Sequence, residues 1–208
     1  MNALWTDSAT DRPIPLFAAL RNDLIAHIPA ERRGGPWLAR LVRGLSVVVT
    51  SSGFRLTWNY RLSHMARGRW GVPGRVVSAF LYWWGRRFYG CSIAPTARIH
   101  GGLILPHPQG IIIGAGAVVG PWTWIFQNVT IGGAPGRAGL PRVGSDARIY
   151  AGAVLSGPIT VGDNVMIGAN ATVYRDLPSR TVARAATIEV SPLPDRFRCD
   201  PDDPPPST

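Results

Sequence analysis

Apolar residues along this chain follow two spacings, a helical one in the first half and a shorter, regular one in the second. Leu16, Leu20, Leu24 and Ile28 recur at intervals of four, which predicts a helix over residues 14–28. Three more helices are predicted at residues 37–49, 54–70 and 75–89, with breaks at 29–36, 51–53 and 71–74. The first 90 residues are therefore expected to be helical.

After Gly90 the period becomes six. The aliphatic positions are Ile93, Ile99, Leu105, Ile113, Val119, Ile125, Ile131, Val143, Ile149, Leu155, Val161, Ile167 and Val173. The fifth position of each six is nearly always small or apolar, as at Ala97, Ala117 and Ala147. A fixed period of six predicts a parallel β-helix, because stacked coils bury an apolar column that no single coil could bury. A β-sandwich would instead alternate at period two, and that alternation is absent.

These patterns divide the chain into a helical, aromatic-rich leader (residues 1–90), a hexapeptide-repeat β-helix (91–188) and a Pro/Asp-rich tail (189–208). The formal charge of +10 is uneven: the leader holds 13 Arg against four acidic residues, whereas residues 91–208 hold nine against eight. The sequence contains no lysine, which excludes Schiff-base and lysine general-base chemistry. The field of the leader suits an anionic surface or ligand.

Cysteine usage and hydropathy bear on location. Cys91 and Cys199 form neither a disulfide framework nor a metal cluster, so a reducing cytoplasm is the expected setting. The first residues lack the apolar core of a signal peptide, and the longest apolar runs, such as 76–84, are about half of what spans a bilayer. The aromatic residues and arginines at 83–89 suit either peripheral contact with the inner face of a membrane or packing within an oligomer.

The repeat is disrupted at two places. Residues 106–110, reading PHPQG, lengthen the interval between Leu105 and Ile113 from six to eight, and residues 132–142 form a Gly/Pro-rich loop that keeps the phase. His107 lies in the first disruption between two prolines that restrict its backbone. Loops on a rigid scaffold tend to carry function, so His107 is the candidate catalytic residue, with an idle loop histidine as the alternative.

The string LILPHPQGIIIGAGAVVGPWTWIFQNVTIGG resembles the active-site segment of the serine acetyltransferases, and LRNDLIAHI and WNYRLSHMA resemble the helical leader of that family. The resemblance covers about residues 14–188. It implies a left-handed parallel β-helix, a handedness that comes from the resemblance alone. It also implies direct acetyl transfer from acetyl-CoA, with His107 as the general base. The implied assembly is a homotrimer, with pairing of two trimers through the leader left open.

The same resemblance implies further site residues. Backbone N–H groups around Gly132 and Gly133 would stabilise the oxyanion, although glycines needed only for a tight corner are the alternative. The stretch IGANATVYRDLP would bind the coenzyme through Gly168 and Ala169, with Arg175 near its phosphates or in a surface ion pair near Asp176. No metal is expected: a β-helix carbonic anhydrase needs three zinc histidines, and the coils hold only His100 and His107. No nucleic-acid partner is expected either.

Three departures from the family pattern concern the acceptor. Ser92 replaces the aspartate that orients the histidine, so Ser92 Oγ or a backbone carbonyl would have to accept from the imidazole. Pro106 replaces an acid, and Gly139 and Leu140 replace an arginine and a second histidine. These losses resemble the colanic-acid, exopolysaccharide-type branch, which acetylates sugars.

A sugar acceptor is therefore the predicted substrate, bound by Trp122, Trp124 and Asn128. Serine O-acetyltransferase of cysteine biosynthesis and a non-catalytic hexapeptide scaffold are the alternatives.

Overall fold

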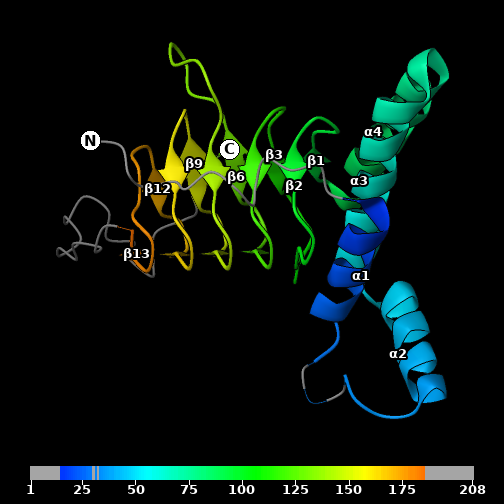
Figure 1. Ribbon diagram of the computed structural model, residues 1–208. Helices are drawn as coiled ribbons and strands as arrows, with labels where there is room; N and C mark the ends of the chain where they lie inside the picture. The colour runs from blue at the N-terminus through cyan, green and yellow to red at the C-terminus, as the bar shows by residue number, and fades with distance from the viewer. Residues whose placement is uncertain (1–14, 30, 32, 186–208) are drawn as a thin grey trace, which may run out of the picture.

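The computed structural model describes residues 15–29, 31 and 33–185, so the tail predicted at 189–208 lies outside the described residues. Four helices come first: α1 (Leu16–Ala26), α2 (Trp37–Thr50), α3 (Ser52–Arg69) and α4 (Gly71–Tyr89). They lie together at one end of a stack of β-coils (Figure 1). The change from helix to strand falls between Tyr89 and Ser92, close to the position that the sequence predicts.

The predicted break at residues 71–74 is wrong, because α4 already begins at Gly71. Pro73 lies in the first turn of α4, where a missing backbone N–H costs little. Gly74 lies where α4 crosses α3: a Cβ there would stand 2.0 Å from the carbonyl oxygen of Ala66. These residues therefore serve close helix packing rather than a loop.

The remaining described chain forms short strands of two or three residues that pair in parallel. Sheet 1 contains β1 (Ser92–Ile93), β3 (Ile112–Ile113), β6 (Thr130–Gly132), β9 (Val154–Ser156) and β12 (Thr172–Val173). Sheet 2 contains β2 (Arg98–Ile99), β4 (Val118–Val119), β7 (Arg142–Val143) and β10 (Thr160–Val161). Sheet 3 contains β5 (Trp124–Ile125), β8 (Arg148–Ile149), β11 (Met166–Ile167) and β13 (Val182–Ala183). From β3 to β12 the strands visit the three sheets in turn, and the isolated parallel bridges of Ile104 with Trp124 and of Leu177 with Val161 take the missing places in the first and last coils. The predicted parallel β-helix is therefore confirmed.

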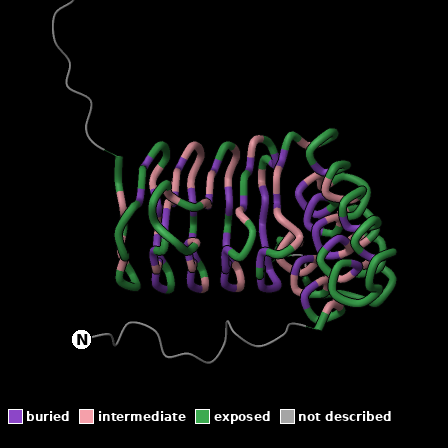
Figure 2. Tube along the Cα trace, turned by 90° about the horizontal axis from the view of Figure 1, so that it is seen from above, coloured by how far each residue is buried: buried purple, intermediate pink, exposed green. Residues whose placement is uncertain are grey.

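The core is the column of aliphatic side chains that the six-residue period predicts. Each predicted position is buried, from Ile93 at 6% exposure to Val173 at 4%, and those between are 0–2% exposed. The small or apolar residues at the fifth positions, among them Ala97 and Ala147, are buried as well. The tube in Figure 2 shows the same inward positions recurring from coil to coil.

The corner between sheets 3 and 1 requires a special backbone. Gly110, Asn128, Gly152 and Asn170 occupy it in successive coils, all with φ between 58° and 71°. Glycine and asparagine adopt this left-handed conformation most readily. The two residue types also fit together, because a Cβ on Gly110 would stand 2.1 Å from Asn128 Oδ1. This corner carries the PHPQG disruption.

A buried ion pair joins the leader to the first coil. Arg61 Nε of α3 lies 3.0 Å from Asp23 Oδ2 of α1, and both side chains are almost fully buried. Asp23 Oδ1 also accepts from the backbone N–H groups of Gly102 (2.7 Å) and Leu103 (3.0 Å). Arg61 donates further to backbone carbonyls of the first coil, including that of His100 at 2.6 Å. The leader is therefore fixed against the coil that precedes His107.

Candidate active site

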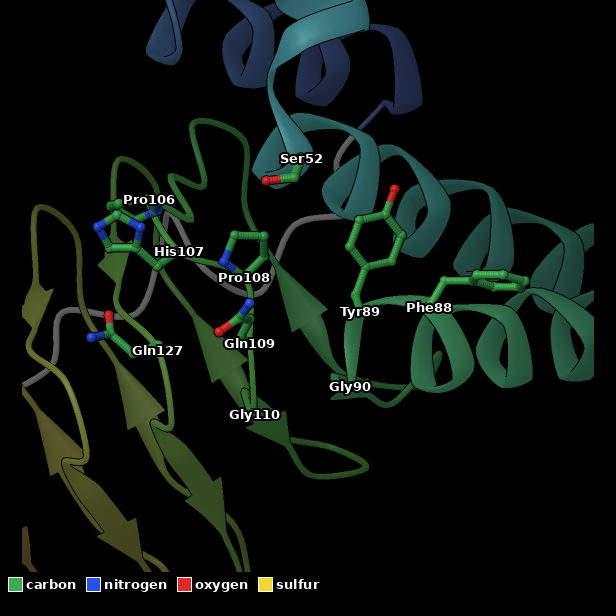
Figure 3. A pocket seen from close by; sticks show the side chains of 10 residues that line it. All are labelled: Ser52, Phe88, Tyr89, Gly90, Pro106, His107, Pro108, Gln109, Gly110 and Gln127. Carbon is green, nitrogen blue, oxygen red and sulfur yellow. The ribbon is translucent and has the colours of Figure 1, made fainter.

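A cavity of about 830 Å³ separates the leader from the 3–1 corner. The β-helix contributes residues 106–110 and Gln127 to its lining, and the leader side contributes Ser52, Phe88, Tyr89 and Gly90. Figure 3 shows His107 and Gln127 on one side, Ser52 and Tyr89 on the other, and Pro108 between them. None of these lining residues is an aspartate, glutamate or arginine, so the cavity wall contains no carboxylate or guanidinium.

His107 owes its position to the two prolines around it. The N–H of Gln109 donates to the carbonyl of His107 at 2.8 Å, which closes a three-residue turn centred on Pro108. The fixed φ of proline is close to what such a turn requires. Pro108 is buried whereas His107 is exposed, so the turn anchors the corner and presents the imidazole to the cavity.

Gln127 is a site residue that the sequence analysis missed. It lies one coil beyond His107 at the same corner and lines the same cavity. Its Oε1 is buried and has no hydrogen-bond partner within the described part of the chain. An unpaired buried acceptor costs about 1–3 kcal/mol, which a donor on a bound ligand would relieve. Gln127 begins the QNVTIGG run, whose resemblance to the serine acetyltransferases was a signal that could have found it.

Ser92 is not brought to His107. Its hydroxyl lies 2.5 Å from the hydroxyl of Tyr82 in α4, and Ser92 is not among the residues that line the cavity. The imidazole of His107 makes no side-chain hydrogen bond within residues 15–29, 31 and 33–185. The hydroxyl of Ser92 thus helps to hold α4 against β1. Its role in orienting the histidine stays a prediction.

Two of the three predicted acceptor-binding residues have structural reasons for their positions. Trp122 occupies the corner between sheets 2 and 3, away from the 3–1 corner, and its ring covers Gly102 of the preceding coil. Asn128 provides the left-handed corner residue that lies against Gly110. Neither lines the cavity that His107 faces.

Trp124, unlike Trp122 and Asn128, is the first of a row of stacked aromatic rings on the surface. It is 37% exposed on sheet 3 and stacks with Phe126 at 6.4 Å, and Phe126 stacks with Tyr150 at 5.0 Å. Phe126 immediately precedes Gln127 in the chain, so the row leads toward the rim of the cavity. Trp124 is therefore the predicted acceptor residue whose surroundings are most compatible with that role.

Gly132 ends β6 and Gly133 follows it, where the chain leaves sheet 1 for sheet 2, so both lie at another edge of the β-helix from His107. A Cβ on either would meet no atom closer than 3.7 Å, and neither has a positive φ. A tight corner would require glycine at these positions, and neither the available space nor the backbone angles require it. The geometry therefore does not support the alternative in which these glycines only form a corner. The loop that follows is held by Arg137, whose Nη1 donates to the carbonyl of Tyr174 at 3.2 Å.

The predicted coenzyme-binding residues occupy later coils. Gly168 and Ala169 lie at the 3–1 corner, three coils after His107 and hence about 14 Å along the axis at a strand spacing of roughly 4.8 Å. Arg175 is exposed at the edge where sheet 1 gives way to sheet 2. Among the described residues Arg175 forms no ion pair with Asp176, whose Oδ1 accepts from the N–H of Thr160 at 2.7 Å. In the described residues no three His, Cys, Asp or Glu side chains gather as a metal site.

Known proteins place this geometry in context. Residues 141–175 match the family model described as bacterial transferase hexapeptide (six repeats). A serine acetyltransferase of Synechococcus elongatus is 35% identical over 139 residues, which cover 65% of this chain and 55% of that protein. This chain therefore spans little more than half the length of that relative.

Solved structures agree in fold. A soybean serine acetyltransferase complexed with serine superposes with a TM-score of 0.69 at 28% identity, covering 82% of this chain and 67% of that one. A serine acetyltransferase in complex with CoA superposes with a TM-score of 0.67 at 26% identity, with the same coverage of both chains. This chain is thus similar to serine acetyltransferases in both the helical leader and the β-helix.

Proposed function

We propose that this chain is an acetyl-CoA-dependent O-acetyltransferase of the serine acetyltransferase type, with His107 as its general base. The position of His107 supports this proposal most strongly. A turn centred on a proline holds His107 at the disrupted corner, where it faces a cavity of about 830 Å³. The similarity to serine acetyltransferases, one of them in complex with CoA, supports acetyl-CoA as the donor.

Direct transfer is the mechanism that fits these residues. The acceptor hydroxyl oxygen attacks the thioester carbonyl carbon while an imidazole nitrogen of His107 takes the hydroxyl proton. The tetrahedral intermediate then expels the thiolate, which takes the proton back from the imidazolium, leaving the ester and the CoA thiol. A cysteine nucleophile is disfavoured: Cys91 is buried, and burial raises the pKa of its thiol and so lowers the thiolate fraction.

A homotrimer would complete the site. The predicted oxyanion glycines and Arg175 lie at another edge of the β-helix from His107, so one chain does not gather them. Threefold packing of the prism faces would set the His107 edge of one chain beside that other edge in its neighbour. Sedimentation equilibrium should give three times the chain mass, and an active monomer would contradict the proposal.

The acceptor class has two candidates. The relatives favour L-serine, since one similar structure is a complex with serine. The lining of the cavity favours a neutral hydroxyl compound such as a sugar, because a buried zwitterion needs charged partners and the lining contains no carboxylate or guanidinium. The aromatic row at Trp124, Phe126 and Tyr150 would offer a flat surface for a sugar ring. The similarity gives serine the stronger support, and the cavity keeps the sugar as the second candidate.

Rates of CoA thiol release separate these outcomes. The full chain would be assayed with acetyl-CoA against L-serine, nucleotide sugars and polysaccharide fragments. A kcat/KM for serine near about 10⁴ M⁻¹s⁻¹ or above establishes the serine acceptor. A high value for a sugar with a poor one for serine establishes the second candidate. No release above the rate without acceptor, for any of the compounds, would favour the non-catalytic scaffold and contradict the enzyme.

A further inference from the structure

The helix α4 buries small residues and exposes large apolar ones, which is the reverse of an ordinary amphipathic helix in a soluble protein. Its buried positions are the small residues Gly74, Ser78 and Gly85, which let α3 approach closely. At that contact the hydroxyls of Ser63 and Ser78 lie 3.0 Å apart. The large apolar side chains of α4 consequently point outward. The exposed ones are Val72, Val76, Val77, Phe80, Trp83, Trp84 and Phe88, each 40–71% exposed.

These outward side chains form a continuous stripe. Phe80, Trp84 and Phe88 are spaced four residues apart and therefore lie on one face of the helix. Their rings are in contact, with centroids 6.1 Å apart between Phe80 and Trp84 and 4.1 Å apart between Trp84 and Phe88. The stripe ends at Phe88, which lines the His107 cavity.

The helix α2 also exposes large apolar side chains. It has no buried residue, and its exposed apolar side chains recur at helical spacing. They are Trp37, Leu38, Leu41, Val42, Leu45, Val48 and Val49, each 42–72% exposed. Both helices lie at the leader end of the molecule, beyond the first coil (Figure 1). We call the exposed apolar side chains of α2 and α4 together the leader face.

The charge around the leader face identifies its partner. Between residues 32 and 145 the sequence has no aspartate or glutamate, and nine arginines fall between Trp37 and Tyr89. Arg40, Arg69, Arg75 and Arg87 are exposed on or beside the two helices. A second copy of this chain would set arginines against arginines, whereas anionic lipid headgroups would pair with them.

We propose that the leader face docks on an anionic lipid membrane, with the aromatic rings at the acyl boundary and the arginines among the headgroups. No helix in the described part of the chain is long and apolar enough to cross a membrane, so α2 and α4 would lie in the plane of the interface. Because the stripe ends at the cavity, docking would also hold the His107 corner close to the membrane surface.

Vesicle flotation of the full chain tests this proposal without any activity measurement. We expect the protein to float with vesicles of phosphatidylcholine and phosphatidylglycerol, to float poorly with phosphatidylcholine alone, and to lose binding as salt rises. Replacing Phe80→Ser and Trp84→Ser together should weaken binding about 100-fold, since each ring contributes about tenfold when it leaves water. Arg69→Gln with Arg75→Gln should weaken it by roughly 30-fold, about fivefold for each charge.

Tyr174→Ser is the matched control, because Tyr174 is 65% exposed but lies on the β-helix away from the leader face. Its binding should equal that of the unaltered chain. Quenching of tryptophan fluorescence by brominated phosphatidylglycerol gives a second measurement that needs no variant, and anionic vesicles should quench strongly. Absence of both flotation and quenching overturns the proposal. So does a double variant of Phe80 and Trp84 that floats like the unaltered chain, or one that only reduces self-association in sedimentation.

Discussion

The buried pair of Asp23 and Arg61 gives a sharp test of how the leader is attached. Asp23→Ala would remove two hydrogen bonds to the guanidinium, at 3.0 and 3.2 Å. It would also remove the acceptor for the N–H groups of Gly102 and Leu103. Arg61 would keep its bonds to carbonyls of the first coil, but its charge would be buried without a counterion.

The expected loss of stability follows from these contacts. Removing one partner of a buried ion pair costs about 3–5 kcal/mol, largely because the other charge remains buried. For a chain of this size each kcal/mol lowers Tm by about 2–4 °C, so we expect a fall of roughly 6–20 °C. Replacing both residues by apolar ones, Asp23→Leu with Arg61→Met, should recover much of the loss because no charge is left unpaired.

Thermal unfolding followed by circular dichroism would measure the effect. Asp163→Ala is the matched control: this exposed carboxylate also accepts two hydrogen bonds, from the N–H and the hydroxyl of Ser145, both at 2.7 Å. The control should shift Tm by much less. If Asp23→Ala lowered the unfolding free energy by less than about 1 kcal/mol, the ion pair would not be what fixes the leader to the coil.

Three further predictions concern the packing around the site. Burial raises the pKa of Tyr60 to about 12, partly offset by Arg61, so the folded state favours the neutral phenol. This preference contributes about 2–3 kcal/mol to the free energy of unfolding; the contribution should be complete below pH 10 and lost as pH rises through 12. Denaturant midpoints measured across that pH range would show the loss. Gly110→Ala should cost about 1–3 kcal/mol in denaturant unfolding, because φ is +64° and the new Cβ would meet Asn128; a cost near zero would refute the corner argument. Ser92→Ala should lower kcat less than tenfold, since its hydroxyl bonds Tyr82, and a larger loss would restore its predicted role in orienting His107.

The β-helix could be predicted from sequence because its core is local in the sequence. Each coil places an aliphatic residue inward every six positions, so the pattern from Ile93 to Val173 specifies both the strands and the buried column. The corners carried a signal of the same kind, since the PHPQG disruption marked the position of His107. Periodicity thus located the scaffold and marked His107, whereas the role of His107 as a general base came from the resemblance to a known family.

The contacts between leader and β-helix could not be predicted in this way. Asp23 and Arg61 are 38 residues apart and look like ordinary surface residues of amphipathic helices, yet both are buried. Tyr89 reaches the His107 cavity through the docking of α4 on β1, which no spacing in the sequence reveals. Trp122 and Asn128 were predicted to bind a sugar because a flat ring and a neutral amide suit such an acceptor. Corner geometry and packing on the preceding coil explain both positions.

Replacing the candidate base tests the proposed function most directly. CoA thiol release would be measured for the unaltered chain with its best acceptor and for His107→Asn, which preserves side-chain size but cannot accept the proton. His64→Asn is the control, since His64 Nδ1 lies 2.8 Å from the carbonyl of Pro95 and the residue does not line the cavity. With His107 as the general base, kcat falls about 10²- to 10⁴-fold in His107→Asn, acetyl-CoA binding is unchanged, and the control retains full activity. A His107→Asn variant that keeps more than a tenth of the original kcat would contradict the account.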